Sequence, residues 1–288
     1  MSVLLQISDP HFGTEQPPVV EALAALALRQ RPDLLVLSGD ITQRARRDEF
    51  RAARAFVDRL GAPLLAIPGN HDIPLFDLRA RLFHPYARHC EAFGDDIEPE
   101  HASRELLVLC VNTTRRWRHK NGQVSTRQIE RVAERLSRAG ANQLRVVVVH
   151  QPVAVLRDED VHDRLRNHAA AQVRWAAAGA DLVMGGHIHL PYVMALHEPQ
   201  QHAARDTRAT LATRATLVTR AMWAVQAGTS VSARVRRGVP NSVNIVRWGV
   251  DAPTGRCVIE QWDYVAREQA FVRATVTDVK PAREAHVA

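Results

Sequence analysis

The sequence contains few cysteines, few aromatic residues and no long hydrophobic run. Of its 288 residues, 3 are cysteines and 5% are aromatic. The cysteines, Cys90, Cys110 and Cys257, are odd in number and widely spaced, which argues against a disulfide framework and predicts free thiols in a reducing compartment. No apolar run approaches the roughly 18 residues that a membrane span needs, and no basic leader with a cleavage site precedes the first apolar run. We therefore expect a cytoplasmic protein without a membrane span.

Positive charge is in excess, with a net charge of +7 at pH 7 that comes mostly from arginine. A nucleic-acid-binding protein is one explanation. The stretch RARRDEFRAARAFVDRL, however, mixes arginine with acidic residues at helical spacing, as on a solvated helix face. The aromatic residues on which single-stranded nucleic acid stacks are also scarce. Nucleic acid is thus a possible partner but not the favoured one, and the charge could instead steer a small anionic substrate.

Short apolar runs alternate with amphipathic stretches along the first two thirds of the chain. Each run is too short for a helix and lacks polar alternation, which predicts buried strands at residues 3–8, 33–38, 63–68, 106–111, 145–149 and 181–185. Helices are predicted between them, as in DEFRAARAFVDRL and TRQIERVAERLSRAG. This order predicts an α/β layered fold. After Gly186, runs such as SVNIVRWGV and CVIEQWDYV predict a second, more antiparallel sheet.

No linker or domain-scale repeat divides the chain, so we predict a single domain over residues 1–275. Residues 200–221 are rich in alanine, threonine and arginine and nearly repeat themselves, which suggests an insertion into this domain. Residues 276–288 are predicted to form a frayed C-terminal tail.

Polar side chains of the metal-ligand type follow five of the predicted strands. They are Asp9 and His11, then Asp40, then Asn70, His71 and Asp72, then His150, and finally His187 and His189. Because sites in α/β sheets form at the carboxyl ends of strands, we expect these side chains to lie together. Residues two apart in an extended chain point to the same side, roughly 6 to 7 Å from each other, so the members of one pair can reach two different ions.

The mixture of nitrogen and oxygen ligands indicates the kind of metal site. It suits Mn, Fe, Zn, Co or Ni better than Ca or Mg, and the absence of cysteine from the set argues against a closed structural zinc site. Catalytic metal ions lie roughly 3.5 to 4 Å apart and repel each other, so a carboxylate is needed between them. Asp40 suits this bridging position, because the small Gly39 before it lets the backbone approach the cluster.

In this order, the motifs D-x-H, G-D, G-N-H-D, a histidine after a β run and G-H-x-H resemble those of the calcineurin-like metallophosphoesterase superfamily. The resemblance covers residues 3–190 and is closest to the bacterial cyclic-nucleotide phosphodiesterase branch. It implies a four-layer α-β-β-α sandwich, in which helices flank two facing mixed sheets. It also implies one metal ion held by Asp9, His11, Asp40 and His189, and a second held by Asp40, Asn70, His150 and His187.

The same resemblance implies that His71 contacts the phosphate and assists the leaving group, and that Asp72 orients the His71 ring. The implied activity is hydrolysis of a small phosphate ester, with two divalent or mixed-valence ions and a hydroxide that bridges them as the nucleophile. A phosphodiesterase is the leading prediction, and a 3′,5′-cyclic nucleotide is the first candidate substrate. Two alternatives stay open: a phosphomonoesterase or nucleotidase, and a protein-binding scaffold on the same fold that catalyses nothing.

The distribution of basic residues favours the diester. A monoester carries nearly two negative charges at neutral pH and a diester one, so a monoesterase tends to place additional cations around its pocket. The motif loops contain no arginine or lysine. The segment GTSVSARVRRGVPNS could still fold against the pocket and bring arginine with it. A phosphomonoesterase therefore stays an alternative.

Overall fold

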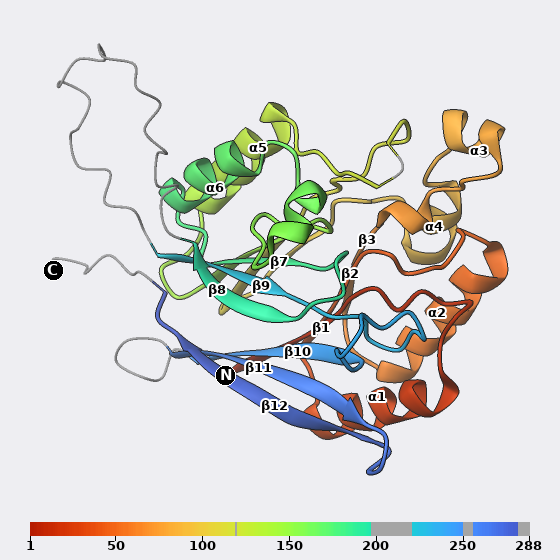
Figure 1. Cartoon of the computed structure of the whole chain (residues 1–288). Helices are drawn as coiled ribbons and strands as arrows, with labels where there is room; N and C mark the ends of the chain where they lie inside the picture. The colour runs from red at the N-terminus through yellow and green to blue at the C-terminus, as the bar shows by residue number, and fades with distance from the viewer. Residues whose placement is uncertain (119, 197–220, 250–255, 282–288) are drawn as a thin grey trace, which may run out of the picture.

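Two six-stranded mixed sheets face each other at the centre of the molecule (Figure 1). The computed structural model describes residues 1–118, 120–196, 221–249 and 256–281. The first sheet has the strand order β12-β11-β10-β1-β2-β3, and the second has the order β4-β5-β6-β7-β9-β8. Each sheet has a group of parallel strands with antiparallel strands beside it. In the first sheet, β10 pairs antiparallel with β1. In the second sheet, β4 pairs antiparallel with β5, and β8 pairs antiparallel with β9.

The elements of the two sheets have the following bounds. The first sheet contains β1 (Ser2–Ile7), β2 (Leu34–Ser38), β3 (Leu64–Ile67), β10 (Ser242–Gly249), β11 (Arg256–Val265) and β12 (Ala270–Val279). The second contains β4 (Glu100–Ala102), β5 (Leu106–Cys110), β6 (Leu144–Val148), β7 (Leu182–Gly185), β8 (Tyr192–Leu196) and β9 (Met222–Gln226). The helices are α1 (Pro17–Gln30), α2 (Arg47–Leu60), α3 (Leu78–Phe83), α4 (Ala87–Phe93), α5 (Thr126–Ser137) and α6 (His168–Ala177), with short 3-10 helices at Asn70–Asp72 and Asp158–Asp163.

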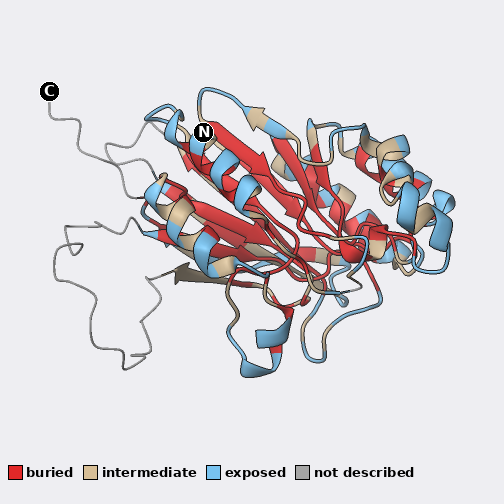
Figure 2. Cartoon of the chain, turned by 90° about the horizontal axis from the view of Figure 1, so that it is seen from above, coloured by how far each residue is buried: buried red, intermediate tan, exposed pale blue. Residues whose placement is uncertain are grey.

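Helices cover the outer face of each sheet, and three apolar cores separate the layers. Figure 1 shows α1 and α2 beside the first sheet and α5 and α6 beside the second. Leu26 of α1 belongs to the core under the first sheet, and Trp175 of α6 to the core over the second. The middle core contains residues of both sheets, such as Val36 and Val146. Figure 2 shows these buried strands between helices whose outer faces are exposed. The expected four-layer sandwich is therefore confirmed.

Local sequence explains where the main helices begin and end. Helix α2 has Asp48 and Glu49 in its first turn, where carboxylates stabilise the positive end of the helix dipole, and Gly61 follows its last turn with a φ of 67°. Helix α5 begins with a capping box. The Ser125 hydroxyl accepts from the Gln128 amide at 3.2 Å, and the Gln128 side chain accepts from the Ser125 amide at 3.0 Å.

The strands after Gly186 do not form a separate sheet, so that part of the sequence-based prediction is wrong. Strands β8 and β9 extend the second sheet, whereas β10, β11 and β12 extend the first. The predicted tail also begins too early, because β12 continues to Val279 and thus past residue 275. Residues 282–288 of that tail, and the predicted insertion up to residue 220, lie outside the described residues.

Within the described parts of the chain, no helix is long and apolar enough to cross a membrane. Cys90 is half-buried, and Cys110 and Cys257 are buried. Burial raises the pKa of the Cys110 thiol. The thiol therefore stays protonated at neutral pH, and Cys110 packs as a small apolar side chain.

Candidate metal centre

The polar side chains predicted from the sequence converge between the two sheets. The first sheet supplies four of them from loops after β1, β2 and β3: Asp9, His11, Asp40 and Asn70. The second sheet supplies three from loops after β6 and β7: His150, His187 and His189. Three groups of these side chains, one of which includes His71, have ligand atoms within 4.8 Å of one another. The site thus lies where the carboxyl ends of the parallel strands of both sheets meet.

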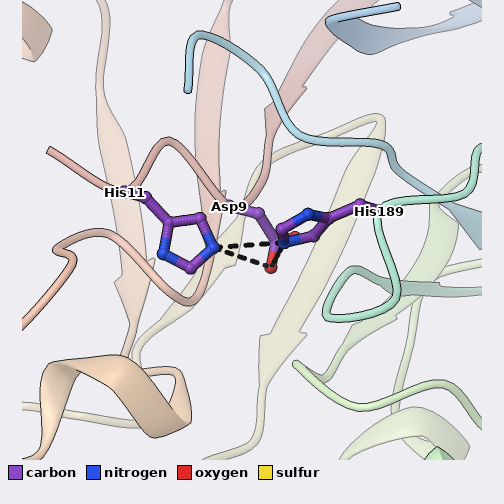
Figure 3. A group of neighbouring side chains, drawn as sticks. All are labelled: Asp9, His11 and His189. Atoms are coloured by element: carbon purple, nitrogen blue, oxygen red, sulfur yellow. Dashed lines mark hydrogen bonds and ion pairs between the residues drawn. The ribbon is translucent and has the colours of Figure 1, made fainter. Parts of the chain in front are cut away.

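One cluster consists of Asp9, His11 and His189 (Figure 3). The Nε2 atoms of His11 and His189 lie 3.1 Å apart, and Nε2 of His189 lies 3.4 Å from Oδ1 of Asp9. Asp9 and His11 have no exposed surface. Two imidazole nitrogens and a carboxylate oxygen that lie this close together in a largely buried space are the kinds of donor that bind a divalent cation.

A second cluster consists of Asp40, His150 and His187. Nε2 of His150 lies 3.3 Å from Oδ1 of Asp40 and 3.3 Å from Oδ1 of Asn70. Both ring nitrogens of His187 are buried and make no hydrogen bond within normal distance among the described residues, although Oδ1 of Asp163 lies 3.6 Å from Nε2. A buried imidazole without a hydrogen bond is costly unless something else binds it, so this cluster also fits a cation.

Asp40 faces both clusters. Its Oδ1 approaches His150, while its Oδ2 lies 3.9 Å from Nε2 of His11. Its Oδ1 also accepts a hydrogen bond of 2.8 Å from the backbone N–H of His71, which fixes the carboxylate. A carboxylate with one oxygen toward each of two neighbouring cation sites has the geometry that a bridging ligand needs.

Backbone carbonyls orient two of the histidine rings. Nδ1 of His150 lies 2.9 Å from the carbonyl of Ser38, and Nδ1 of His189 lies 2.7 Å from the carbonyl of Arg234. A carbonyl can only accept, so Nδ1 carries a proton in both rings, and Nε2 is the nitrogen that faces the site.

The backbone around the site is compressed. Asp9, His11, Asp40, His187 and His189 all have positive φ, between 44° and 75°. Residues other than glycine rarely adopt this conformation, and it clusters at functional sites. Glycines allow the close approach of the loops: a Cβ on Gly69 would lie 2.0 Å from the amide nitrogen of Asp40, and one on Gly186 would lie 1.9 Å from Oγ of Ser8.

Gly39 also matches its predicted role. It has a φ of 95°, and a Cβ there would lie 2.4 Å from Nδ1 of His150. The absence of a side chain therefore lets the loop after β2 pass directly against a ring of the second cluster.

Charges inside the site favour ionised carboxylates, and they shift the pKa values of the histidines in opposite directions. Burial by itself would raise the pKa of Asp9, but the hydrogen bond and charge of His189 outweigh it and lower this pKa to about 2. Burial likewise opposes ionisation of Asp40, yet the charge of His150 holds its pKa well below the usual value. Burial lowers the pKa of His11 to about 3, so its ring stays neutral at neutral pH. Burial opposes protonation of His150, but the charge of Asp40 outweighs it and raises this pKa to about 9, and Asp9 likewise raises the pKa of His189. The carboxylates therefore attract positive charge, and a bound cation would replace a proton on each of these two rings.

His71 and Asp72 do not interact in the predicted way. Nδ1 of His71 lies 2.9 Å from the carbonyl of Gln43, so a backbone group orients this ring. The Asp72 carboxylate instead accepts from the backbone N–H groups of Ile41 at 3.0 Å, Thr42 at 2.8 Å and Gly69 at 2.8 Å. Asp72 therefore joins the loops after β2 and β3 and does not orient the His71 ring. An aspartate that follows such a turn often caps it by accepting backbone hydrogen bonds, and Asp72 has this common role.

A cavity of about 530 Å³ opens onto the site. Its lining includes His71 and three basic residues absent from the motif loops, namely Lys120, Arg234 and Arg236. The expectation that the pocket lacks fixed cations is therefore wrong. Arg234 and Arg236 come from the segment after β9 that the sequence analysis named as the exception. Asp160 and Asp163 also line the cavity, and no motif in the sequence marks them.

A family model described as calcineurin-like phosphoesterase matches residues 2–191, and the chain belongs to this family. The resemblance seen in the motifs is thereby confirmed. Three curated relatives carry phosphodiesterase names. The chain is 40% identical over 81 residues to a glycerophosphodiester phosphodiesterase of Enterobacter lignolyticus, covering 24% of this chain and 29% of the relative.

The chain is 48% identical over 80 residues to a probable cyclic nucleotide phosphodiesterase of Synechococcus, covering 25% of this chain and 31% of the relative. It is 26% identical over 210 residues to a cAMP/cGMP dual specificity phosphodiesterase of Mycobacterium tuberculosis, covering 65% of this chain and 61% of the relative. The matches thus span less than two thirds of the length of each of these relatives.

Two solved structures share the fold. A dimetal phosphatase from Danio rerio has a TM-score of 0.65 at 14% sequence identity, with 98% of this chain and 99% of that chain covered. A purple acid phosphatase from yellow lupin has a TM-score of 0.63 at 10% identity, with 97% of this chain and 53% of that chain covered. At these identities the likeness concerns the fold alone.

Proposed function

We propose that the chain is a metal-dependent phosphodiesterase that hydrolyses small phosphodiesters, with 3′,5′-cyclic nucleotides as the first candidates. The observation that carries the proposal is the pair of neighbouring clusters that Asp40 faces with its two carboxylate oxygens. In this proposal Asp9, His11, Asp40 and His189 hold one divalent ion, and Asp40, Asn70, His150 and His187 hold the other. The donors suit Mn, Fe, Zn, Co or Ni. The phosphodiesterase names of the curated relatives support the substrate class.

Bound ions would supply an activated water and stabilise negative charge on the phosphoryl oxygens. The protein would contribute orientation and proton transfer. The carbonyl of Gln43 holds the His71 ring by Nδ1, which leaves Nε2 on the side of Arg234 and the cavity. Nε2 is thus the atom of His71 that would face the leaving ester oxygen, and it would give that oxygen a proton from the ring form that carries protons on both nitrogens. The buried walls of the two clusters would exclude bulk water from the ligands.

A phosphomonoesterase is the second candidate, and a specific observation favours it. Lys120, Arg234 and Arg236 all line the cavity, and fixed cations suit the higher charge of a monoester. The candidate ligands are complete, which speaks against a scaffold without catalysis on this fold.

Kinetics with paired substrates test the proposal. On Mn-loaded protein, bis(p-nitrophenyl) phosphate should give a higher kcat/KM than p-nitrophenyl phosphate at neutral pH, and cyclic nucleotides should be hydrolysed. The Asp40→Ala variant is the control, since it removes the shared ligand and should lose both ions and the activity. A preference for the monoester would replace the proposal with the second candidate. Full activity of Asp40→Ala would refute the assignment of the metal site.

A further inference from the structure

The three basic residues that line the cavity differ in how their charges are balanced. Nζ of Lys120 lies 2.8 Å from Oδ1 of Asp163. Nη1 of Arg236 lies 2.9 Å from Oδ1 of Asp160, and its other terminal nitrogen contacts Glu159. Arg234 has no carboxylate at ion-pair distance in the described part of the chain. It is therefore the cation of this cavity whose charge no described carboxylate balances.

The side chain of Arg234 lies directly beside the candidate catalytic histidine. Its Nη1 lies 3.0 Å from Oε1 of Gln43, 3.2 Å from Nε2 of His71 and 3.4 Å from Nδ1 of His11. Because Nδ1 of His71 donates to the carbonyl of Gln43, Nε2 is the ring nitrogen that can accept from the guanidinium. These contacts use a single nitrogen of Arg234, so most of its five N–H donors stay available for another acceptor.

The backbone of Arg234 is fixed to the metal centre. Its carbonyl accepts from Nδ1 of His189 at 2.7 Å, and its N–H donates to Oγ of Ser232 at 2.9 Å. The same residue thus orients a candidate ligand through its main chain and extends a cation over the cavity through its side chain. A guanidinium placed in this way is suited to a phosphoryl group, whose oxygens match its planar fork.

We propose that the Arg234 guanidinium binds a non-bridging oxygen of the substrate phosphoryl group and exchanges its contact with Nε2 of His71 for that oxygen. The inference rests on the proposed function, because it places the phosphoryl group at the metal centre. In the free protein Arg234 covers Nε2 of His71, and in the complex it leaves this atom to the leaving oxygen. Arg234 is then both an anion-binding residue and the residue that controls access to His71.

Phosphate binding tests the inference without turnover. Inorganic phosphate is titrated calorimetrically into Mn-loaded wild type and into Arg234→Ala, Arg234→Lys and Arg237→Ala. Arg237 lies in the same loop, is exposed and does not line the cavity, so its variant is the matched control. We expect Arg234→Ala to raise the Kd for phosphate about 10- to 100-fold, the usual value of a charge-assisted hydrogen bond. Arg234→Lys should bind phosphate more tightly than Arg234→Ala but less tightly than wild type, because lysine keeps the positive charge and lacks the planar fork of the guanidinium.

Two further measurements separate this role from a structural one. Metal content should stay at the wild-type level in Arg234→Ala, since the carbonyl that holds His189 is kept. In a His71→Ala background, Arg234→Ala should still weaken phosphate binding. If Arg234 acts only by orienting His71, the second substitution has no effect in that background, and the inference fails.

The outcome also distinguishes the inference from the proposed function. If wild type hydrolyses phosphodiesters but Arg234→Ala matches Arg237→Ala in phosphate Kd, the inference is wrong and the function stands. If phosphate binding depends on Arg234 while no phosphoester is hydrolysed, the anion site stands and the proposed function fails.

Discussion

Gly186 lies against the side chains of Ser8 and Asp9, and this contact leaves no space for a methyl group. A Cβ there would lie 1.9 Å from Oγ of Ser8 and 2.4 Å from Oδ2 of Asp9. We expect Gly186→Ala to displace the Asp9 carboxylate, so the metal content should fall below two ions per chain and kcat/KM should fall by about 10²-fold or more, as misplaced catalytic groups usually cause. Metal analysis and steady-state kinetics measure both effects.

Gly140→Ala is the matched control for this substitution. A Cβ on Gly140 would meet its nearest neighbour, Oε1 of Gln143, at 3.5 Å, which is an ordinary contact. This variant should keep wild-type metal content and activity. Two bound ions in Gly186→Ala would mean that the loop relaxes, and the close approach would then be unnecessary for the site.

The role of His71 in proton transfer depends on the leaving group. His71→Ala should retain the metal ions, because the bond to Asp40 comes from the His71 backbone. Its kcat should fall by roughly 10²–10⁴ for an alkyl ester, which needs a proton on the leaving oxygen. The loss should be smaller for a nitrophenyl ester, whose leaving group departs as a stable anion. Equal losses for both esters would make His71 a phosphate-binding residue only.

The residues of the candidate centre could be predicted to a large extent from the sequence. Each candidate ligand follows a short apolar run, so its place at a strand end follows from hydrophobic pattern and α/β topology. The positive φ values of Asp9 and His187 have no such signal, because tertiary contacts impose them. Arg234 and Asp163 enter the cavity through folding of distant loops, which no local pattern encodes. The partners of Asp72 were missed for the same reason.

At the scale of elements, helix α4 buries the ring of His89. The His89 ring lies between Phe50 and Phe93, at centroid distances of 6.2 Å and 5.3 Å. Neither ring nitrogen has a hydrogen-bond partner among the residues that the structure describes. Burial lowers the pKa of His89 to about 4. The ring is therefore neutral in the folded protein at neutral pH.

This burial predicts a loss of stability in acid. In the unfolded chain, His89 is protonated below its pKa of about 6.5. In the folded protein, the same ring is protonated only near pH 4 and below. Between these pH values, protonation therefore stabilises the unfolded state relative to the folded state. The free energy of unfolding should therefore fall as the pH drops from 6.5 to 4, by on the order of 3 kcal/mol from this residue. Urea unfolding at pH 7.5 and pH 5 should show a smaller difference for His89→Leu than for wild type. His84→Leu, at an exposed position, should behave as wild type.

Buried and exposed elements differ in how far the sequence predicts them. The predicted strands at 33–38 and 181–185 agree with β2 and β7 to within one residue, because both are buried along their whole length. Helix α3 has no buried residue, so it lacks the apolar stripe on which a helix prediction depends. Strand β12 is an edge strand with five consecutive exposed residues, and nothing in its pattern separated it from a tail.

At the scale of the whole molecule, the metal centre connects two sheets that also meet through their apolar core and through hydrogen bonds, such as those from Gln6 to the carbonyl of Gly185 and from Asn244 to the carbonyl of Gln226. We expect removal of metal with a chelator to lower the Tm, since ions that bind only the folded state stabilise it by roughly 2.7 kcal/mol at a free concentration 100 times their Kd. Added Mn should restore the Tm. Asp40→Ala should respond to neither treatment. An unchanged Tm after verified metal loss would show that the apolar core and the hydrogen bonds between the sheets hold them together without the ions.

The pairing of β1 with β10 has a consequence for the order in which the chain is made. β1 lies between β2 and β10, and Ser2 pairs with Trp248. Thr229, in the loop before β10, donates a hydrogen bond of 2.6 Å to the carbonyl of Asp9. A ribosome releases all seven candidate ligands well before β10 emerges, while β1 still has an unpaired edge. We therefore expect the nascent chain to hold its metal ions firmly only after β10 has left the ribosome, which makes metal capture a late step of synthesis.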